Sequence, residues 1–460
     1  MKQGNANLSV GTPWKILLAY TLPMLGSAVF QQIYTIADTV IAGKFAGESA
    51  LAAVGASMSI VNILMAVALG ANAGCAVLAA RYFGAKDTRR TLSCILSSFV
   101  GFFTLSVVLM GAGFLSSGPV LSALRTPDSV MKESVLYLNI YIAGLPSLIL
   151  YNLATGIYSA LGDSKTPFFF LVSSSLANIL LDYIFTAVCK WGVSGVAWAT
   201  FITQTAACIL TLICLLFRLK KMHAAYKREE ETAYKKPSFS WGLLGAVCVA
   251  ALPVVLQNGF VSLGNLFIQS IINGYGESAM AGFTAGFKIL IFCTTCICTL
   301  GTGLTNYASQ NLGAGEIKRI KTGFLSELVI SSAVSMALFA LVFLFSGTLV
   351  GLFLEDGGSA ALDYGKLFVK IVSPFFIVVN LKVAADCTVR GCGGNLGFMV
   401  STFADLILRV AFAFILSPVL GMQGVFWSWP IGWGIGTVIA LLFYFNIPIL
   451  KKFRKQSSAA

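Results

Sequence analysis

Charged residues are scarce in this chain of 460 residues: only 11% are Asp, Glu, Lys or Arg, whereas 57% are hydrophobic. A soluble domain keeps about a quarter of its residues charged. The scarcity therefore excludes an ordinary soluble globular protein. The mean hydropathy of +0.85 points the same way, and we expect most of the chain to lie in a lipid bilayer.

Histidine is almost missing, and His223, the single one, stands in a charged segment. Metalloprotease, nucleophile-elbow and Walker-type motifs are also missing, so the sequence does not favour an enzyme. The 11 cysteines fall mostly inside apolar stretches, where they act as small hydrophobes. We expect no enzymatic activity, no disulfide framework and no bound cofactor.

Long apolar runs recur along the whole chain, and each is long enough to cross a hydrocarbon core about 30 Å thick at about 1.5 Å per residue. The sequence predicts an all-α integral membrane protein with twelve transmembrane helices. The expected spans are near 16–41, 50–80, 91–115, 134–158, 167–188, 192–217, 241–272, 279–310, 322–346, 363–388, 396–418 and 424–447.

The formal net charge of +13 is explained by where the basic residues stand. If the N-terminus is inside the cell, 22 of the 31 Lys and Arg residues fall in cytoplasmic segments and only 6 on the outer side. Cytoplasmic loops of membrane proteins collect Lys and Arg in this way. We therefore expect a multi-pass protein of the cell inner (plasma) membrane with both termini in the cytoplasm and no nucleic-acid partner.

The chain contains an internal repeat. Residues 79–87 (AARYFGAKD) correspond to residues 308–316 (ASQNLGAGE) at an offset of 229, and residues 47–50 correspond to residues 276–279 at the same offset. Leu22-Pro23 corresponds to Leu252-Pro253 at an offset of 230. We expect two six-helix lobes, 1–217 and 241–460, joined by a cytoplasmic linker at 218–240. An even number of spans gives both lobes the same orientation, with a transport path between them.

Two acidic residues inside the first lobe stand out, because a carboxylate in a membrane is costly and usually functional. Asp38 shares one helix face with Gln31 and Tyr34, and Asp182 shares one face with Ser174 and Asn178. Both acids are expected in the outer half of the membrane. Facing each other, they would line a small hydrophilic pocket whose oxygen ligands suit Na⁺, or whose carboxyl groups share a proton.

The second lobe lacks this arrangement. Its buried charges are spaced as pairs, Asp405 with Arg409 and Lys382 with Asp386, which can neutralise one another at i, i+4. The seventh span instead carries a polar, uncharged stripe that includes Asn258 and Asn265.

Taken in order, residues 22–23, Asp38, residues 47–53 (GESALAA), residues 81–87 (RYFGAKD) and residues 160–167 (ALGDSKTP) resemble the multidrug and toxic compound extrusion (MATE) family over almost the entire chain. The resemblance implies two six-helix lobes in a V-shaped bundle, and export of organic, often cationic, compounds against entry of Na⁺ or H⁺. In the branch whose first lobe holds the cation site, this chain matches at Asp38, Asn178, Asp182 and Thr200.

From the residues and the resemblance together we expect Asp38 and Asp182 to bind Na⁺ or a proton, with Asn178 and Thr200 beside them. Pro23 is a candidate hinge, because an interior proline frees a backbone carbonyl near residue 19 and permits a bend. The candidate substrate-binding residues are Gln31, Tyr34, Tyr137, Asn152, Asn258 and Asn265.

Other functions stay open at this point. Duplicated exporters of the same superfamily flip lipid-linked precursors, and their cavities are typically more cationic than the acidic pocket expected here. A channel or receptor fits less well, because a duplicated chain with a carboxylate pair in only one lobe suits a coupled carrier. The expected partners are small organic substrates and the lipid bilayer, and we expect a monomer.

Overall fold

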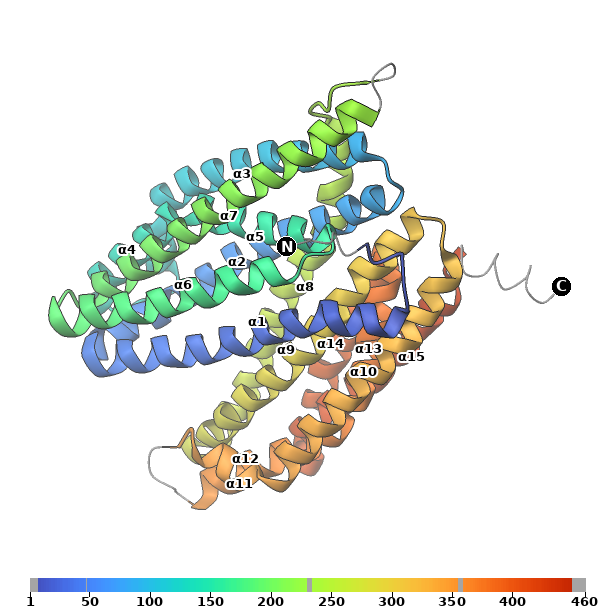
Figure 1. Ribbon diagram of the computed structural model, residues 1–460. Coiled ribbons are helices and arrows are strands. Elements are labelled where there is room, and N and C mark those ends of the chain that lie inside the picture. Colours follow the sequence, from blue (N-terminus) through green and yellow to red (C-terminus); the bar gives the residue numbers. More distant parts are fainter. Residues whose placement is uncertain (1–6, 47, 230–233, 355–358, 449–460) are drawn as a thin grey trace. The chain divides into compact units, whose positions relative to one another are not determined.

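The computed structural model describes residues 7–46, 48–229, 234–354 and 359–448, and these residues form helices and short connections with no strand among them (Figure 1). They fall into two compact units: unit 1 comprises residues 1–7 and 26–255, and unit 2 comprises residues 8–25 and 256–460.

The helices of unit 1 follow one another in the order of the chain. Their bounds are α2 (Glu48–Gly84), α3 (Thr88–Ala123), α4 (Asp128–Ala143), α5 (Leu145–Ala160), α6 (Lys165–Tyr183) and α7 (Val193–Glu229). Short π-helical segments, η1 (Ala42–Ala46) and η2 (Ile184–Val188), extend α1 (Pro13–Ile41) and α6.

Unit 2 repeats this plan. Its helices are α9 (Glu277–Gly313), α10 (Ile317–Leu344), α11 (Ser346–Gly351), α12 (Ser359–Val372), α13 (Phe376–Gly391), α14 (Asn395–Leu420) and α15 (Met422–Phe445), and a single 3₁₀ turn, η3 (Ser373–Phe375), joins α12 to α13. The remaining helix, α8 (Trp241–Asn273), is divided between the two units.

Eleven helical runs of the described residues are long and apolar enough to cross a membrane, and the α4–α5 pair, bent by 45°, makes a twelfth. The predicted all-α membrane fold is therefore confirmed. The fourth span of each half breaks at the same place in the repeat: α4 gives way to α5 at Gly144, two residues before Pro146, and α12 gives way to α13 through η3, which contains Pro374.

Two helices pass from one unit to the other. The first part of α1, up to Leu25, belongs to unit 2, whereas its remainder belongs to unit 1; α8 makes the opposite change after Val255. Each change follows an interior proline by two residues, Pro23 in α1 and Pro253 in α8. The two positions of change differ by 230 residues, the offset of the repeat, so the exchange belongs to the duplicated design.

Each exchanged helix segment packs closely against a glycine of the unit that it joins. A Cβ atom on Gly74 of α2 would stand 2.6 Å from the Val247 carbonyl oxygen and 2.8 Å from the Ala251 Cβ of α8. A Cβ atom on Gly303 of α9 would stand 2.4 Å from Cγ2 of Thr21 in α1. Gly74 and Gly303 are equivalent in the repeat, and small residues allow close helix approach in membranes.

Polar contacts anchor the same two segments. Gln310 accepts a hydrogen bond from the Leu8 backbone N–H at 2.9 Å, and Arg319 donates to the Gly11 carbonyl at 2.7 Å, both within unit 2. In unit 1 the Ser240 N–H, immediately before α8, donates to the hydroxyl of Ser97 at 2.9 Å. The compact units thus differ from the predicted lobes 1–217 and 241–460 by exchanging residues 8–25 and 241–255. The division of the chain into two lobes at 1–217 and 241–460 describes the two halves of the repeat, and it stays a prediction.

The predicted linker at 218–240 is partly helical. α7 continues to Glu229, residues 230–233 lie outside the described part of the chain, and the chain then returns along α3. His223 of α7 is held against Tyr234 by ring stacking and a hydrogen bond of 2.7 Å.

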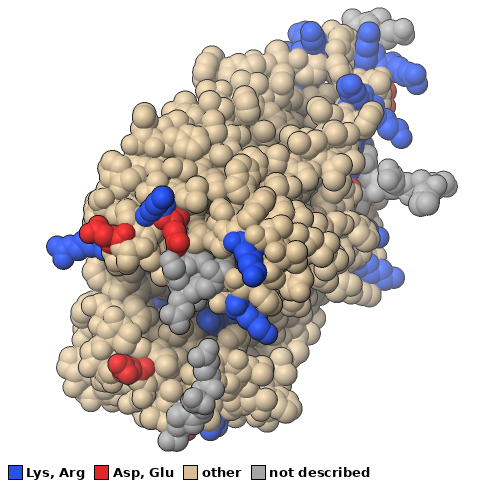
Figure 2. Space-filling model, turned by 90° about the vertical axis from the view of Figure 1, so that its left-hand side faces the viewer, with Lys and Arg blue, Asp and Glu red and all other residues tan. Residues whose placement is uncertain are grey.

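The surface fits a lipid environment. Most of the face shown in Figure 2 carries no charged side chain. Large apolar side chains are exposed on helices of both units, including Leu115, Phe217, Val329 and Leu344. Exposure of this extent would favour aggregation in water but is expected where lipid tails cover the helices.

Candidate functional site

Asp38 and Asp182, called here the carboxyl pair, lie near the ends of α1 and α6, and each is followed within one turn by a π-helical segment. The two π segments pack together, and Phe45 meets Tyr183 edge to face with ring centroids 5.5 Å apart. Single π turns inside α-helices often occur at functional sites, because they shift the register of the side chains that follow. Here they bring the ends of two helices far apart in the sequence to one place.

The two carboxyl groups face each other closely enough to form a hydrogen bond once one of them carries a proton. Asp182 is fully buried and Asp38 is half-buried. Among the described residues no group donates a hydrogen bond to either carboxyl oxygen of Asp182 or to Oδ1 of Asp38. Two such carboxylates cannot both stay charged without compensation, so the arrangement is chemically suited to a shared proton or a bound cation.

Tyrosines from two helices complete one side of this site. Tyr34, one turn before Asp38 on α1, lies near both acids and near Thr200 of α7. Tyr137 of α4 lies near both acids as well. Their phenol groups can orient toward a charged or a neutral carboxyl group, because a hydroxyl both donates and accepts.

Asn178, one turn before Asp182 on α6, adds another oxygen. Its amide nitrogen donates to the Thr203 hydroxyl at 3.4 Å, and its buried carbonyl oxygen Oδ1 has no hydrogen-bond partner in the described part of the chain. The Thr203 hydroxyl itself donates to the Ala199 carbonyl at 2.8 Å. Carboxylate and amide oxygens that lack donors are the ligands that a hard cation such as Na⁺ prefers.

The structure thus brings together six of the predicted site residues. They are Tyr34, Asp38, Tyr137, Asn178, Asp182 and Thr200. Their cation-binding and substrate-binding roles remain predictions.

Four predicted residues stand apart from this group. Gln31 has an exposed side chain. Asn152 belongs to a separate polar cluster, in which its side-chain amide donates to the Leu148 carbonyl and its backbone carbonyl accepts from the Asn72 side chain, each at 2.9 Å. Asn258 and Asn265 lie on the part of α8 that belongs to unit 2.

Sequence reasoning missed two residues next to the site. Thr203, which orients the amide of Asn178, is one turn after Thr200, and Tyr141, whose hydroxyl is buried without a partner, is one turn after Tyr137. Each lies one helical turn from a predicted site residue, and this spacing could have identified both from the sequence.

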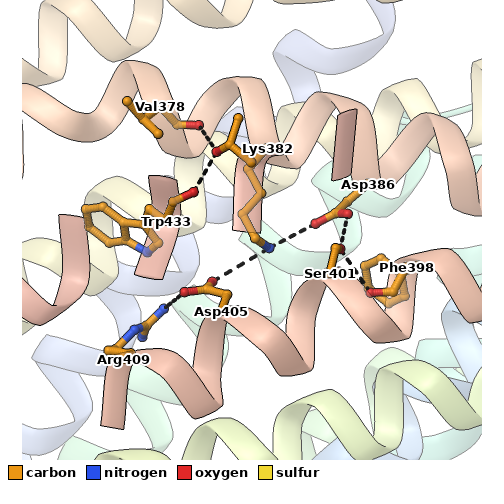
Figure 3. A network of polar contacts seen from close by, with 9 residues as sticks. Val378, Lys382, Asp386, Phe398, Ser401, Asp405, Arg409 and Trp433 are labelled. Atoms are coloured by element: carbon orange, nitrogen blue, oxygen red, sulfur yellow. Dashed lines mark hydrogen bonds and ion pairs between the residues drawn. The ribbon is translucent and has the colours of Figure 1, made fainter. Parts of the chain in front are cut away.

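Unit 2 contains a charge network instead of an acidic pair (Figure 3). The two predicted i, i+4 pairs are present: Lys382 binds Asp386 at 2.9 Å, and Arg409 binds Asp405 at 3.1 Å. Lys382 also lies 3.7 Å from Asp405, which joins both pairs across α13 and α14, and Ser401 donates to Asp386. With two cationic and two anionic groups the network is neutral, as expected for buried charges that stabilise structure.

The chain matches known proteins over nearly its full length. A family model described as MatE matches residues 23–184 and 253–415, one match in each half of the repeat. Two relatives from Bacillus subtilis (strain 168) are named "Probable multidrug resistance protein YpnP" and "Probable multidrug resistance protein YoeA". The first is 26% identical over 436 residues and the second 25% identical over 438 residues, and each alignment covers 94% of this chain and 93% of the relative.

The fold also matches a solved structure described as "Crystal structure of MATE in complex with MaL6". The TM-score is 0.88 at 22% identity, and the match covers 98% of this chain and 100% of the other.

Proposed function

The chain belongs to the MatE family of membrane transporters, and from this premise we propose that it exports organic, often cationic, compounds in exchange for entry of Na⁺ or H⁺. The names of the two Bacillus relatives support drug export as the physiological activity. The acidic character of the site in unit 1 supports a cationic cargo. A flippase of lipid-linked precursors would be better served by a cationic site.

The observation that carries this proposal is the carboxyl pair. A buried acid without a hydrogen-bond donor is stable only with a proton, a metal cation or another positive charge beside it. An organic cation and a coupling ion can each supply this positive charge. Asp38 and Asp182 therefore bind one or the other, with Asn178 and Thr200 supplying further oxygens, and this competition couples the two fluxes.

The direction of transport follows from the predicted topology. With both termini in the cytoplasm of a plasma-membrane protein, the carboxyl pair stands in the outer half of the membrane. A cation from outside reaches Asp38 and Asp182 before it crosses most of the bilayer, and it displaces the organic cation toward the outside. We expect a monomer to suffice, because all these residues come from one chain.

Counterflow in liposomes tests the proposal. Purified protein is reconstituted, a fluorescent organic cation is supplied, and Na⁺ and pH gradients are imposed separately. We expect accumulation of the fluorescent cation only when at least one of the two gradients is present. Accumulation that is equal with and without both gradients would contradict antiport, and the absence of any uptake with either gradient would contradict drug transport.

A further inference from the structure

Unit 2 contains one buried acid that its charge network does not compensate. Glu327 lies on α10 about 15 Å along the helix axis from Ile317, at a rise of about 1.5 Å per residue. Its side chain is 2% exposed, and neither carboxyl oxygen has a hydrogen-bond partner among the described residues. Nor is an ion pair with a described Lys or Arg formed, in contrast to Asp386 and Asp405.

A polar neighbour of this carboxyl group, Ser331, directs its hydroxyl to the backbone. Ser331, one turn later on α10, lies beside the Glu327 carboxyl group, but its single hydroxyl proton is donated to the Glu327 backbone carbonyl at 2.7 Å. The lone pairs of the Ser331 oxygen remain available. An oxygen with free lone pairs beside a carboxylate repels it, but both oxygens together attract a proton or a metal cation.

Charged and titratable groups on the neighbouring helix do not neutralise Glu327. α10 packs against α13, where Cys387 is the titratable side chain near Glu327. Arg390, three residues later, lies over the Phe398 ring and donates from Nη2 to the Thr305 hydroxyl at 3.2 Å. Its buried Nε has no hydrogen-bond partner among the described residues, and Arg390 forms no ion pair with Glu327 there.

The same helix interface holds more polar atoms without partners. Ser335 of α10, Ser373 of η3 and Asn380 of α13 are all buried, and each has a side-chain oxygen without a hydrogen bond to any described residue. The Asn380 amide nitrogen donates to Ser332 at 3.1 Å, so it is the carbonyl oxygen that is free. Each unsatisfied buried polar atom costs about 1–3 kcal/mol, and a protein tolerates several together where a ligand or proton compensates them.

We propose that Glu327, with Ser331 beside it, forms a second binding site for a monovalent cation, either Na⁺ or H⁺, in the interface between α10 and α13 of unit 2. Binding at this site does not depend on the carboxyl pair, because all of its residues belong to unit 2. Its role in transport rests on the proposed antiport: with two cations entering for each monovalent organic cation that leaves, one net charge crosses the membrane in each cycle.

Equilibrium binding of ²²Na⁺ to the purified full-length protein tests the Na⁺ form of the site. We expect two sites in the wild type, one in Glu327→Gln, and one in the double variant Asp38→Asn/Asp182→Asn. Glu277→Gln, which changes an exposed acid of the same unit, is the matched control and should keep both sites.

Infrared difference spectra between low and high pH test the proton form. A protonated Glu327 gives a carboxylic acid carbonyl band that is lost in Glu327→Gln and kept in Asp38→Asn/Asp182→Asn. Ser331→Ala removes the oxygen to which the acid donates. It should shift this band, or weaken Na⁺ binding about tenfold, the equivalent of about 1.4 kcal/mol.

The two arms together decide the proposal. If Glu327→Gln keeps both the Na⁺ stoichiometry and every carboxylic acid band of the wild type, Glu327 binds no cation. Should this variant not be monodisperse, Ser331→Ala decides in the same way, and an unchanged band with unchanged Na⁺ affinity overturns the proposal. If Glu327→Gln loses export but keeps both the Na⁺ stoichiometry and the carboxylic acid bands, Glu327 has a structural role only. If instead the proposed antiport is wrong, the Na⁺ binding and the carboxylic acid band that depend on Glu327 remain.

Discussion

At the scale of single residues, the carboxyl pair is the proposed coupling site. Asp38→Asn and Asp182→Asn each keep the size and polarity of the side chain but remove the carboxyl group that we propose binds or releases a cation. We expect each variant to lose at least about 90% of active export, a loss of about 1.4 kcal/mol or more in coupling, while membrane insertion and yield stay normal. Asp128→Asn, at an exposed acid of the same unit, is the control for expression and resistance assays. Full drug resistance in both site variants at equal expression would move the coupling site elsewhere.

The charge network of unit 2 gives the opposite expectation. Asp405→Asn removes the carboxylate partner of Arg409 and leaves Lys382 paired with Asp386, whereas Arg409→Gln leaves Asp405 with Lys382. Removing one partner of a buried ion pair costs about 3–5 kcal/mol. We expect Asp405→Asn to lower the unfolding temperature in detergent the most, and the double variant Asp405→Asn/Arg409→Gln to recover part of the loss and keep much of the export.

Transport assays on the two single variants and the double variant complete that test. A double variant as inactive as Asp182→Asn would mean that part of the coupling site lies in unit 2.

Sequence spacing predicted contacts within a helix but not contacts between helices. The pairs Lys382–Asp386 and Asp405–Arg409 follow from the i, i+4 rule alone. The Lys382–Asp405 contact at 3.7 Å joins two helices, and only the packing of α13 on α14 creates it. Glu327 could not be singled out from the sequence, because an acid becomes unusual only when its burial and its lack of partners among the described residues are known.

At the scale of elements, the exchanged segments of α1 and α8 depend on two glycines. A methyl group on Gly74 would stand 2.6 Å from the Val247 carbonyl oxygen, and a methyl group on Gly303 would stand 2.4 Å from Cγ2 of Thr21. Overpacking of this kind costs about 1–3 kcal/mol. We expect Gly74→Ala and Gly303→Ala each to lower the unfolding temperature measured in detergent.

Gly111→Ala is the matched control, because it lies inside α3 with no atom within 4 Å of the added Cβ. A helical Gly→Ala change without a clash stabilises by about 0.4–1 kcal/mol, so its effect should have the opposite sign. Equal effects of all three variants would mean that the helix approach at Gly74 and Gly303 is not close.

Pro23 makes a separate prediction about α1. The proline cannot donate to the Ala19 carbonyl, which leaves α1 easier to bend just before the chain passes from unit 2 to unit 1. We expect Pro23→Ala to stiffen the helix and slow counterflow about tenfold, equivalent to about 1.4 kcal/mol, without weakening substrate binding at equilibrium. Pro119→Ala, in a helix that stays within unit 1, should leave the rate unchanged. A normal rate in Pro23→Ala would remove the hinge from the mechanism.

The repeat predicted which elements are equivalent but not which helices associate. Hydropathy and the offset near 229 were enough for the all-α membrane fold and for the equivalence of Leu22-Pro23 with Leu252-Pro253. The exchange of residues 8–25 and 241–255 between units was not predictable, because α1 and α8 are each continuous and apolar across the point of change. Close approach at Gly74 and Gly303, rather than hydropathy, determines where these segments pack.

At the scale of the whole molecule, the number of cations exchanged sets the driving force. One elementary charge moving down a membrane potential gains about 2.3 kcal/mol per 100 mV. Exchange of one monovalent cation for one monovalent organic cation moves no net charge, so it draws only on the chemical gradient of Na⁺ or H⁺. A second cation bound at Glu327 would add the electrical gradient.

Competition between cations is the most direct test of the central claim that organic cation and coupling ion share the carboxyl pair. The affinity of the purified protein for a fluorescent organic cation is measured while the Na⁺ concentration and the pH are varied. We predict that high Na⁺ or low pH weakens binding about tenfold or more, equivalent to about 1.4 kcal/mol, and that this effect is lost in Asp38→Asn. An affinity in the wild type that responds to neither Na⁺ nor protons would contradict the shared site.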